Sequence, residues 1–134
     1  MIKSNELRLG NLVSINSEEP EFLKIEGIKT YDEKSDYSMV RLESFDKWTS
    51  LNEILPILLT EEWLLRMGGR KINQIDWEIS IRGIKFNCRF NKKWYSSIGG
   101  IYLSDKNQYV HQIQNLVHAL TNEELIITDN HAKK

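Results

Sequence analysis

The chain has 134 residues, of which 40% are hydrophobic, 28% charged and 10% aromatic, and only two are proline. This balance is typical of one compact folded domain and excludes a chain that is disordered throughout. No uncharged apolar stretch approaches the roughly 18 residues that a membrane helix needs. The charged opening MIKSNELRLG lacks the apolar centre of a signal peptide. We therefore expect a cytoplasmic protein with no membrane partner.

Charge is unevenly distributed along the chain. Residues 1–65 carry 7 Lys+Arg and 13 Asp+Glu, residues 66–95 carry 8 and 2, and residues 96–134 carry 3 and 4. Such segregation indicates either a basic surface for anions or attraction between parts of the fold. The nearly neutral total and the acidic first half argue against long double-stranded DNA as a partner.

The sequence offers little that resembles catalytic machinery. Cys88 is the single cysteine, which excludes an intrachain disulfide and a zinc site of clustered cysteines. Its place on the apolar side of an alternating strand predicts a buried, inert thiol. No nucleophile elbow, Gly-rich phosphate loop, zinc signature or spaced pair of carboxylates occurs. We therefore predict no catalytic residue, no metal and no cofactor.

Residues 1–53 predict a strand-rich section. Short apolar runs alternate with polar loops at 16–21 and 30–38, and the Gly10–Asn11 pair is typical of a turn before the first run. Three short strands this close together favour a small, strongly bent antiparallel sheet of the SH3-like type. The expected strands lie at 12–15, 22–28 and 39–42.

A change of period marks the start of a short helix. The apolar segment 54–59 is expected to be extended, because Pro56 disfavours helix at the residue before it. Thr60 is a good helix N-cap, and two glutamates follow in the first turn, where the helix dipole favours negative charge. The sequence thus predicts a helix of two to three turns that ends at Gly68–Gly69.

The clearest pattern is the strict alternation of apolar and polar residues from Ile75 to Ile81. With turns at 82–83 and 99–100 and a loop at 91–93, every register agrees on which face is apolar. The sequence predicts a four-stranded antiparallel meander over residues 74–104. The expected pairs are Ile81 with Ile84, Ile79 with Phe86, Trp77 with Cys88, Ile75 with Phe90, Phe90 with Trp94, Cys88 with Ser96, Phe86 with Ile98, Ile98 with Ile101, and Ser96 with Leu103.

A C-terminal amphipathic helix is predicted from Asn107 to Leu120, because apolar residues recur there at helical spacing. Asn122 is expected to end it in the left-handed conformation, and residues 125–128 to add a last short strand. With the preceding elements this gives an α+β fold. We expect two sections, 1–53 and 54–134, forming one compact unit.

The other face of this helix is rich in amides and histidines. We expect it to hydrogen-bond to the N-terminal sheet or to another subunit. Its two histidines are two turns apart, roughly 10 Å along the axis, which is too far to share a metal ion. The residues of this polar helix face are His111, Gln112, Gln114, Asn115 and His118.

Three stretches of the chain resemble a known family. They are ELRLGNLVSI, ILPILLTEEWLLRMGG and YVHQIQNLVHALTNEEL, and they are similar to small proteins of Bacteroidetes and their phages and prophages. The family often has proline where this chain has Leu58, aromatic residues in place of Gly69 and His118, and glycine in place of Asn122. The resemblance implies a phage or prophage source and a bacterial host cytosol, but no mechanism.

The polar face of the predicted meander combines cations, aromatic rings and an amide. Such a set suits an anionic nucleotide, because it supplies phosphate neutralisation, ring stacking and base-edge hydrogen bonds. The alternative interpretation is an ordinary solvated face on which Asp76 pairs with Arg89. The candidate ligand-binding residues are Lys85, Asn87, Arg89, Lys92, Lys93, Tyr95 and Tyr102.

Two classes of function stay open on the sequence alone. The first is a non-enzymatic binding protein that sequesters a small anionic, nucleotide-like ligand, a counter-defence role that would suit a phage source. The second is an interaction module in which the polar helix face and the Trp48 region bind a host or phage protein. An enzyme without a recognisable motif comes third.

Surplus apolar surface predicts self-association. Trp48, residues 63–65 and the segment 54–59 add to two sheets that already have a helix each, and a chain of this size has limited interior. We therefore expect a homodimer or higher homo-oligomer, most simply through one two-fold interface.

Overall fold

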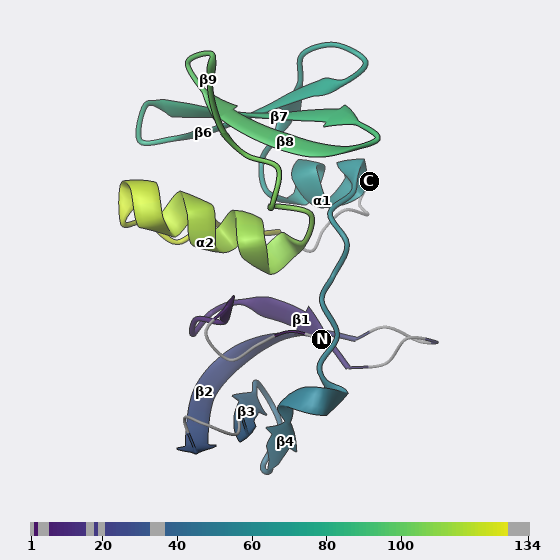
Figure 1. The fold of residues 1–134 in the computed structure, drawn as a ribbon, viewed down its shortest axis with the longest axis vertical. Coiled ribbons are helices and arrows are strands. Elements are labelled where there is room, and N and C mark those ends of the chain that lie inside the picture. The colour runs from purple at the N-terminus through teal and green to yellow at the C-terminus, as the bar shows by residue number, and fades with distance from the viewer. Residues whose placement is uncertain (1, 3–5, 16–17, 19–20, 33–36, 129–134) are drawn as a thin grey trace. The chain divides into compact units, whose positions relative to one another are not determined.

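The computed structural model describes residues 2, 6–15, 18, 21–32 and 37–128, with the backbone alone at 30–32 and 37. The fold is α+β and divides into two compact units, Met1–Ile57 and Leu58–Lys134, each with its own antiparallel sheet (Figure 1). The division lies after Ile57 rather than after residue 53. The reason is that Leu55 exchanges two backbone hydrogen bonds with Ser14, of 2.7 and 2.9 Å, which ties this segment to the first unit.

The described part of the first unit contains four strands rather than the three expected. The additional strand has only three residues, too few for an alternating pattern to be recognised in the sequence. The two strands that precede it in the chain also extend into residues 30–38, which the sequence predicts to be a loop. In spatial order the strands are β1 (Leu12–Ser14), β2 (Phe22–Asp32), β3 (Tyr37–Leu42) and β4 (Trp48–Ser50).

The core of the first unit is aliphatic. A 3₁₀ turn, η2 (Leu51–Glu53), follows β4, and the Ser50 hydroxyl accepts a hydrogen bond from the Asn52 amide to cap it. This turn brings the chain back over the sheet and completes the core. The buried side chains that pack together there are Ile2, Leu7, Val13, Ile25, Val40, Leu42, Leu51 and Ile54.

The short helix of the second unit begins where the sequence predicts. The Thr60 hydroxyl accepts a hydrogen bond from the Trp63 amide at 3.4 Å, and α1 spans Glu61–Arg66. Gly68, with φ of +81°, lies just past its end, a conformation that glycine adopts without a steric penalty. Both helix signals are therefore confirmed.

The second sheet has five antiparallel strands. The unexpected one, β5 (Arg70–Lys71), extends along β6 at one edge and is again too short to show a pattern. All but one of the pairs expected between the next three strands are present, including Ile79 with Phe86 and Cys88 with Ser96. Ile75 lies before the start of β6, although the Phe90 amide donates to its carbonyl at 2.9 Å. The other strands are β6 (Asp76–Ile81), β7 (Ile84–Asn91), β8 (Lys93–Ile98) and β9 (Ile101–Ser104).

One predicted register in this sheet is wrong. Ser96 lies opposite Ser104 instead of Leu103, although Ile98 pairs with Ile101 as expected. The shift is a β-bulge at Leu103, which adds one residue to the edge strand β9. Bulges are common at sheet edges because they twist an exposed edge away from further pairing.

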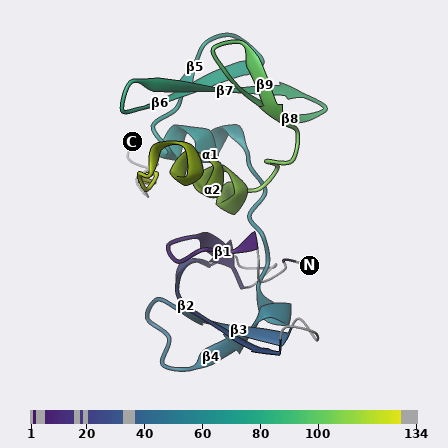
Figure 2. The same ribbon diagram turned by 60° about the vertical axis from the view of Figure 1, so that its left-hand side comes forward.

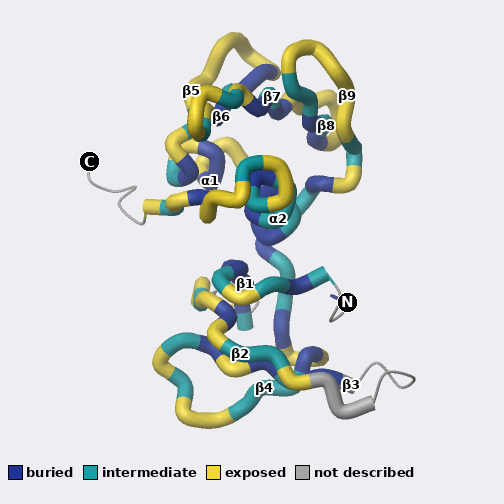
Figure 3. The backbone as a smooth tube through the Cα atoms, turned by 90° about the vertical axis from the view of Figure 1, so that its left-hand side faces the viewer, coloured by how far each residue is buried: buried dark blue, intermediate teal, exposed yellow. Residues whose placement is uncertain are grey.

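Both helices lie on one side of the second sheet (Figures 1 and 2). The Trp77 indole N–H donates to the Glu61 carboxylate of α1 at 3.1 Å, and the Trp94 indole donates to the carbonyl of Leu59 at 3.1 Å. On this face Trp77, Phe86 and Trp94 are buried, whereas Phe90 and Ile101, which share the face by register, are 45% and 69% exposed. Along the strands, buried stretches alternate with exposed or half-buried ones (Figure 3). The face turned away from the helices therefore stays open.

The C-terminal helix, α2, spans Val110–Thr121 and begins three residues later than expected. Its start is set by Gln112, whose side-chain oxygen accepts hydrogen bonds from the Tyr109 and Gln108 amides at 3.0 and 2.8 Å. Asn122 ends the helix with φ of +58°, as predicted. The expected strand at 125–128 does not form; Thr128 instead donates its amide to the carbonyl of Arg66 at 2.8 Å.

Replacing either of two inner-face aromatic residues by alanine should destabilise the protein far more than replacing an outer-face one. Trp77 and Phe86 are 4% and 3% exposed, whereas Tyr102 is 59% exposed. We expect Trp77→Ala and Phe86→Ala to cost about 3–5 kcal/mol through the cavity each leaves. Tyr102→Ala should cost less than about 1 kcal/mol. Urea unfolding of the three variants measures this, and equal losses would mean that the two faces are reversed.

Candidate functional site

A groove of about 580 Å³ lies on the open face of the second sheet. Its volume is within the range of sites that bind small molecules. Strands β6 to β9 and the turn between β8 and β9 all contribute residues to it. Five of the seven candidate ligand-binding residues line this groove, namely Lys85, Asn87, Arg89, Tyr95 and Tyr102, together with Glu78, Ser96, Ser97, Gly99 and Gly100.

Cross-strand pairing brings these residues together in two rows. In the first row Arg89 lies between Asp76 on β6 and Tyr95 on β8. The second row crosses β6 to β9 in the order Glu78, Asn87, Ser97 and Tyr102. Residues opposite one another in an antiparallel sheet point to the same face, so the rows form a continuous polar surface.

Two of the lining residues, Tyr95 and Tyr102, form an aromatic pair. The ring centroids of Tyr95 and Tyr102 are 6.3 Å apart and their planes are inclined by 47°. Rings at this separation attract one another by edge and face contacts. Both side chains stay accessible, so they can offer ring faces to a planar ligand.

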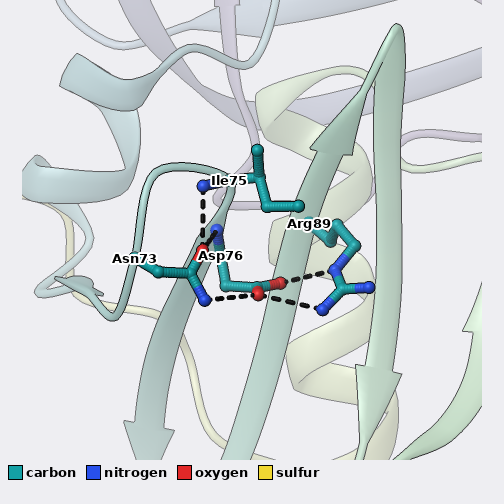
Figure 4. A network of polar contacts seen from close by, with 4 residues as sticks. All are labelled: Asn73, Ile75, Asp76 and Arg89. Atoms are coloured by element: carbon teal, nitrogen blue, oxygen red, sulfur yellow. Dashed lines mark hydrogen bonds and ion pairs between the residues drawn. The ribbon is translucent and has the colours of Figure 1, made fainter.

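A buried carboxylate orients the arginine of the groove (Figure 4). Asp76 accepts hydrogen bonds from Nε and Nη2 of Arg89 at 2.8 and 3.0 Å. The Asn73 side-chain amide donates at 2.8 Å to Oδ2 of Asp76, the same oxygen that accepts from Nη2 of Arg89. The side-chain oxygen of Asn73 accepts hydrogen bonds from the backbone amides of Ile75 and Asp76, both at 2.9 Å. The third guanidinium nitrogen of Arg89 points away from Asp76 in Figure 4 and keeps its hydrogens for another acceptor.

This contact shifts the pKa values of both partners in the direction of the charged forms. Hydrogen bonding to Arg89 lowers the pKa of Asp76; desolvation by burial opposes this shift, and the hydrogen bond from Asn73 adds to it. The Asp76 carboxylate raises the pKa of Arg89 in turn. The side chain of Arg89 is 57% exposed and that of Asp76 is 7% exposed. The pair therefore joins a buried carboxylate to a guanidinium that stays accessible to solvent. The cross-strand pair considered in the sequence analysis is thus present.

The other charged side chains of the groove differ in their partners. Glu78 accepts a hydrogen bond from Arg70 of β5 at 2.9 Å. For Lys85, no carboxylate of a described residue lies within 4.0 Å. Asn87 lies between Lys85 and Arg89 on the same face of β7. The centre of the groove is therefore an amide flanked by two cations.

Two candidate residues lie outside the groove lining. Lys93 forms an ion pair with Asp105 at 2.8 Å, and its Nζ is 5.9 Å from the centroid of the Tyr95 ring. Lys92 occupies the turn before β8 with φ of +67°. Glu78 also lines the groove, although it was not among the predicted site residues. Its alternation with Trp77 and its register opposite Asn87 placed it on the polar face, so the signal was present.

The polar helix face is only partly accessible. His111 and Gln114 are 1% and 3% exposed, respectively. Gln112 caps the start of α2, whereas Asn115 and His118 are half-buried. The His111 ring stacks on the Tyr109 ring, with centroids 6.1 Å apart. Two of the five side chains of this face are therefore buried and the other three are half-buried.

The remaining candidates for chemistry give no second site. Burial raises the pKa of the Cys88 thiol to about 12, so the thiolate that nucleophilic attack requires is not populated near neutral pH. Among the residues that the structure describes, no group of three His, Cys, Asp or Glu side chains is arranged to hold a metal ion. The described helices include none that is long and apolar enough to cross a bilayer.

Comparisons of the chain with protein-family models, with curated proteins and with solved structures find no significant match.

The ion pair of the groove predicts a pH-dependent stability. Asp76→Asn should destabilise the protein by about 1–3 kcal/mol at neutral pH, because it weakens hydrogen bonds to a charged group. The folded-state pKa of Asp76 lies below its ordinary value of 3.8. The contribution of the carboxylate is therefore present above that pH and is lost as the pH falls through the folded-state pKa.

Melting temperatures of the wild type and Asp76→Asn between pH 7 and pH 2.5 measure this effect. The gap between the two proteins should narrow in acid, below roughly pH 4. Glu123→Gln is the matched control, because it removes a carboxylate from an exposed pair with Arg82. Such surface pairs contribute little, so its gap should stay small at every pH. A gap for Asp76→Asn that persists unchanged in acid would contradict the assigned role.

Proposed function

We propose that this chain is a non-enzymatic binding protein whose site is the groove on the open face of the second sheet. The ligand is a small, anionic, nucleotide-like molecule. The observation that carries the proposal is the convergence of Lys85, Asn87, Arg89, Tyr95 and Tyr102 on one groove. These are the residue types that phosphate, base edge and ring face require.

The arrangement within the groove supports this ligand class. Tyr95 and Tyr102 offer ring faces on which a base stacks. Asn87 offers both a donor and an acceptor to a base edge. Arg89 keeps unused N–H groups that point away from Asp76 (Figure 4). A ligand would therefore meet donors whose orientation is fixed before it binds, which reduces the entropy lost on binding.

The biological setting follows from the resemblance to proteins of Bacteroidetes and their phages. A phage or prophage protein with this groove would sequester a nucleotide signal of the host and so act in counter-defence in the host cytosol. The strongly bent sheet of the first unit is proposed to be SH3-like, on the strength of its short antiparallel strands in the order β1-β2-β3-β4.

A thermal-shift screen with nucleotides of all four bases tests the proposal. At least one nucleotide should raise the melting temperature by several degrees, because ligand at 100 times its Kd adds about 2.7 kcal/mol of stability. Lys85→Gln and Tyr95→Leu should remove the shift, since both side chains line the groove. Lys92→Gln, the matched control, changes the same charge outside the groove and should keep the shift. The groove is not the site if no nucleotide shifts the wild type, or if Lys92→Gln matches Lys85→Gln.

The second candidate function is an interaction module, and the Trp48 region supports it. The Trp48 ring lies against Gly27, where an added Cβ would come within 2.9 Å of the ring. The Nζ of Lys29 is 4.7 Å from the centroid of the same ring. A half-buried tryptophan beside a cation is common at protein interfaces. Capture of a host or phage protein that is lost on Trp48→Ala, without any nucleotide shift, would favour this function.

We also propose that the chain self-associates, although less surface is available than the sequence predicts. Most of the apolar side chains that the sequence suggests are in surplus are buried within the chain itself, including Trp63, Leu64 and three residues of segment 54–59. Leu58 and Leu65 stay exposed, as do Ile75 and the neighbouring Phe90. These side chains are available to a second copy. Light scattering at micromolar concentration should give at least twice the chain mass of 15.8 kDa, and a monomeric mass would contradict the proposal.

A further inference from the structure

The groove has several cations, but most of their charge is already balanced. Arg89 is paired with the Asp76 carboxylate. Lys93, at the rim, is paired with Asp105. Arg70 is paired with Glu78, which itself lines the groove. Each of these pairs is neutral as a unit, so none supplies a net positive field to a ligand.

Lys85 is the exception among the groove residues. No carboxylate of the described chain lies within 4.0 Å of its amine, and its side chain is exposed. With the paired groups cancelling, the groove offers about one uncompensated positive charge. Arg89 then acts as an oriented hydrogen-bond donor rather than as a second net charge.

Glu78 adds a constraint of the opposite sign. It lies directly opposite Asn87, at the β6 end of the row that crosses β6 to β9. Its Oε1 accepts the Arg70 hydrogen bond, which leaves Oε2 with lone pairs for another donor. Its side chain is 21% exposed, so it stays accessible from the groove. Arg70 is not part of the groove lining, so the pair presents only its negative member to a ligand. A second or third phosphate placed there would meet that carboxylate and like-charge repulsion.

From this charge pattern we infer that the groove selects a nucleotide with a single phosphate and about one negative charge, such as a cyclic mononucleotide, and discriminates against nucleoside di- and triphosphates. The inference rests on the proposed function and specifies its ligand class. Lys85 neutralises the phosphate, Arg89 donates hydrogen bonds from its fixed guanidinium, and Glu78 rejects additional phosphates.

A series of ligands that share the base with the largest thermal shift tests the inference. Isothermal titration at low ionic strength compares the 3′,5′-cyclic monophosphate with the 5′-mono-, di- and triphosphates. Low salt is needed because screening weakens the discrimination. Affinity should fall along the series, by about fivefold from the cyclic monophosphate to the triphosphate. A triphosphate that binds as tightly as the cyclic monophosphate, or more tightly, would overturn the inference.

Glu78→Gln identifies the group responsible. It preserves the size of the side chain and removes its charge, so triphosphate affinity should rise about fivefold while cyclic monophosphate affinity changes less than twofold. Glu123→Gln is the matched control, because it also frees an arginine from a surface pair but lies outside the groove. It should leave both affinities unchanged. An unchanged ratio in Glu78→Gln would contradict the role of Glu78.

Arg70→Gln is a second variant. The Arg70 side chain is 71% exposed, so this position should tolerate substitution. The variant removes the cation that partly neutralises Glu78, so triphosphate affinity should fall further below that of the wild type. An increase would contradict the inference. If no nucleotide binds the wild type at all, the proposed function fails together with the inference. A preference for polyphosphates, in contrast, overturns the inference alone and leaves the groove as a nucleotide site.

Discussion

The two-residue turn between β6 and β7 fixes the arrangement on which the second unit depends. Arg82 and Gly83 both have positive φ, of 53° and 82°, as in the hairpin turns whose twist matches that of antiparallel strands. The turn sets Ile81 opposite Ile84 and, through the ladder, Asp76 opposite Arg89. Because successive side chains point to opposite faces, a slip of one residue would exchange the core with the groove.

The same register controls the electrostatics of the groove. It places Asp76, the one buried carboxylate among the side chains that the structure describes, directly across from Arg89, and Glu78 across from Asn87. A strongly basic stretch of sequence thereby becomes a surface with little net charge. The resulting surface holds donors in fixed directions and suits a small ligand better than a long polyanion, whose binding depends on many unpaired cations.

The groove belongs to the second unit alone. All of its lining comes from four consecutive strands and their connections, between Glu78 and Tyr102. On the reverse of these strands Trp77, Phe86 and Trp94 are buried. Their burial stabilises the sheet and so holds the groove residues in register. The ligand site and the hydrophobic core are therefore two faces of one structure.

Local chemistry made much of the second unit predictable from the sequence. The alternation around Trp77, the Thr60 cap and the left-handed Asn122 each act over a few residues, and the structure contains all three. Alternation also placed five candidate residues on one face. These features are visible in sequence because their physical causes, a period of two and a local hydrogen bond, involve neighbours in the chain.

The tertiary structure alone decided the features that depend on distant partners. The strands β4 and β5 are too short for a pattern and exist only because a longer strand offers hydrogen bonds. The bulge at Leu103 likewise arises from the pairing of β9 with β8, which no local signal encodes. The charge balance of the groove is of the same kind: Glu78 with Arg70 and Lys93 with Asp105 pair across a folded surface. The sequence determines which residue types are present, but the net charge of the groove depends on which of them form ion pairs in the folded chain.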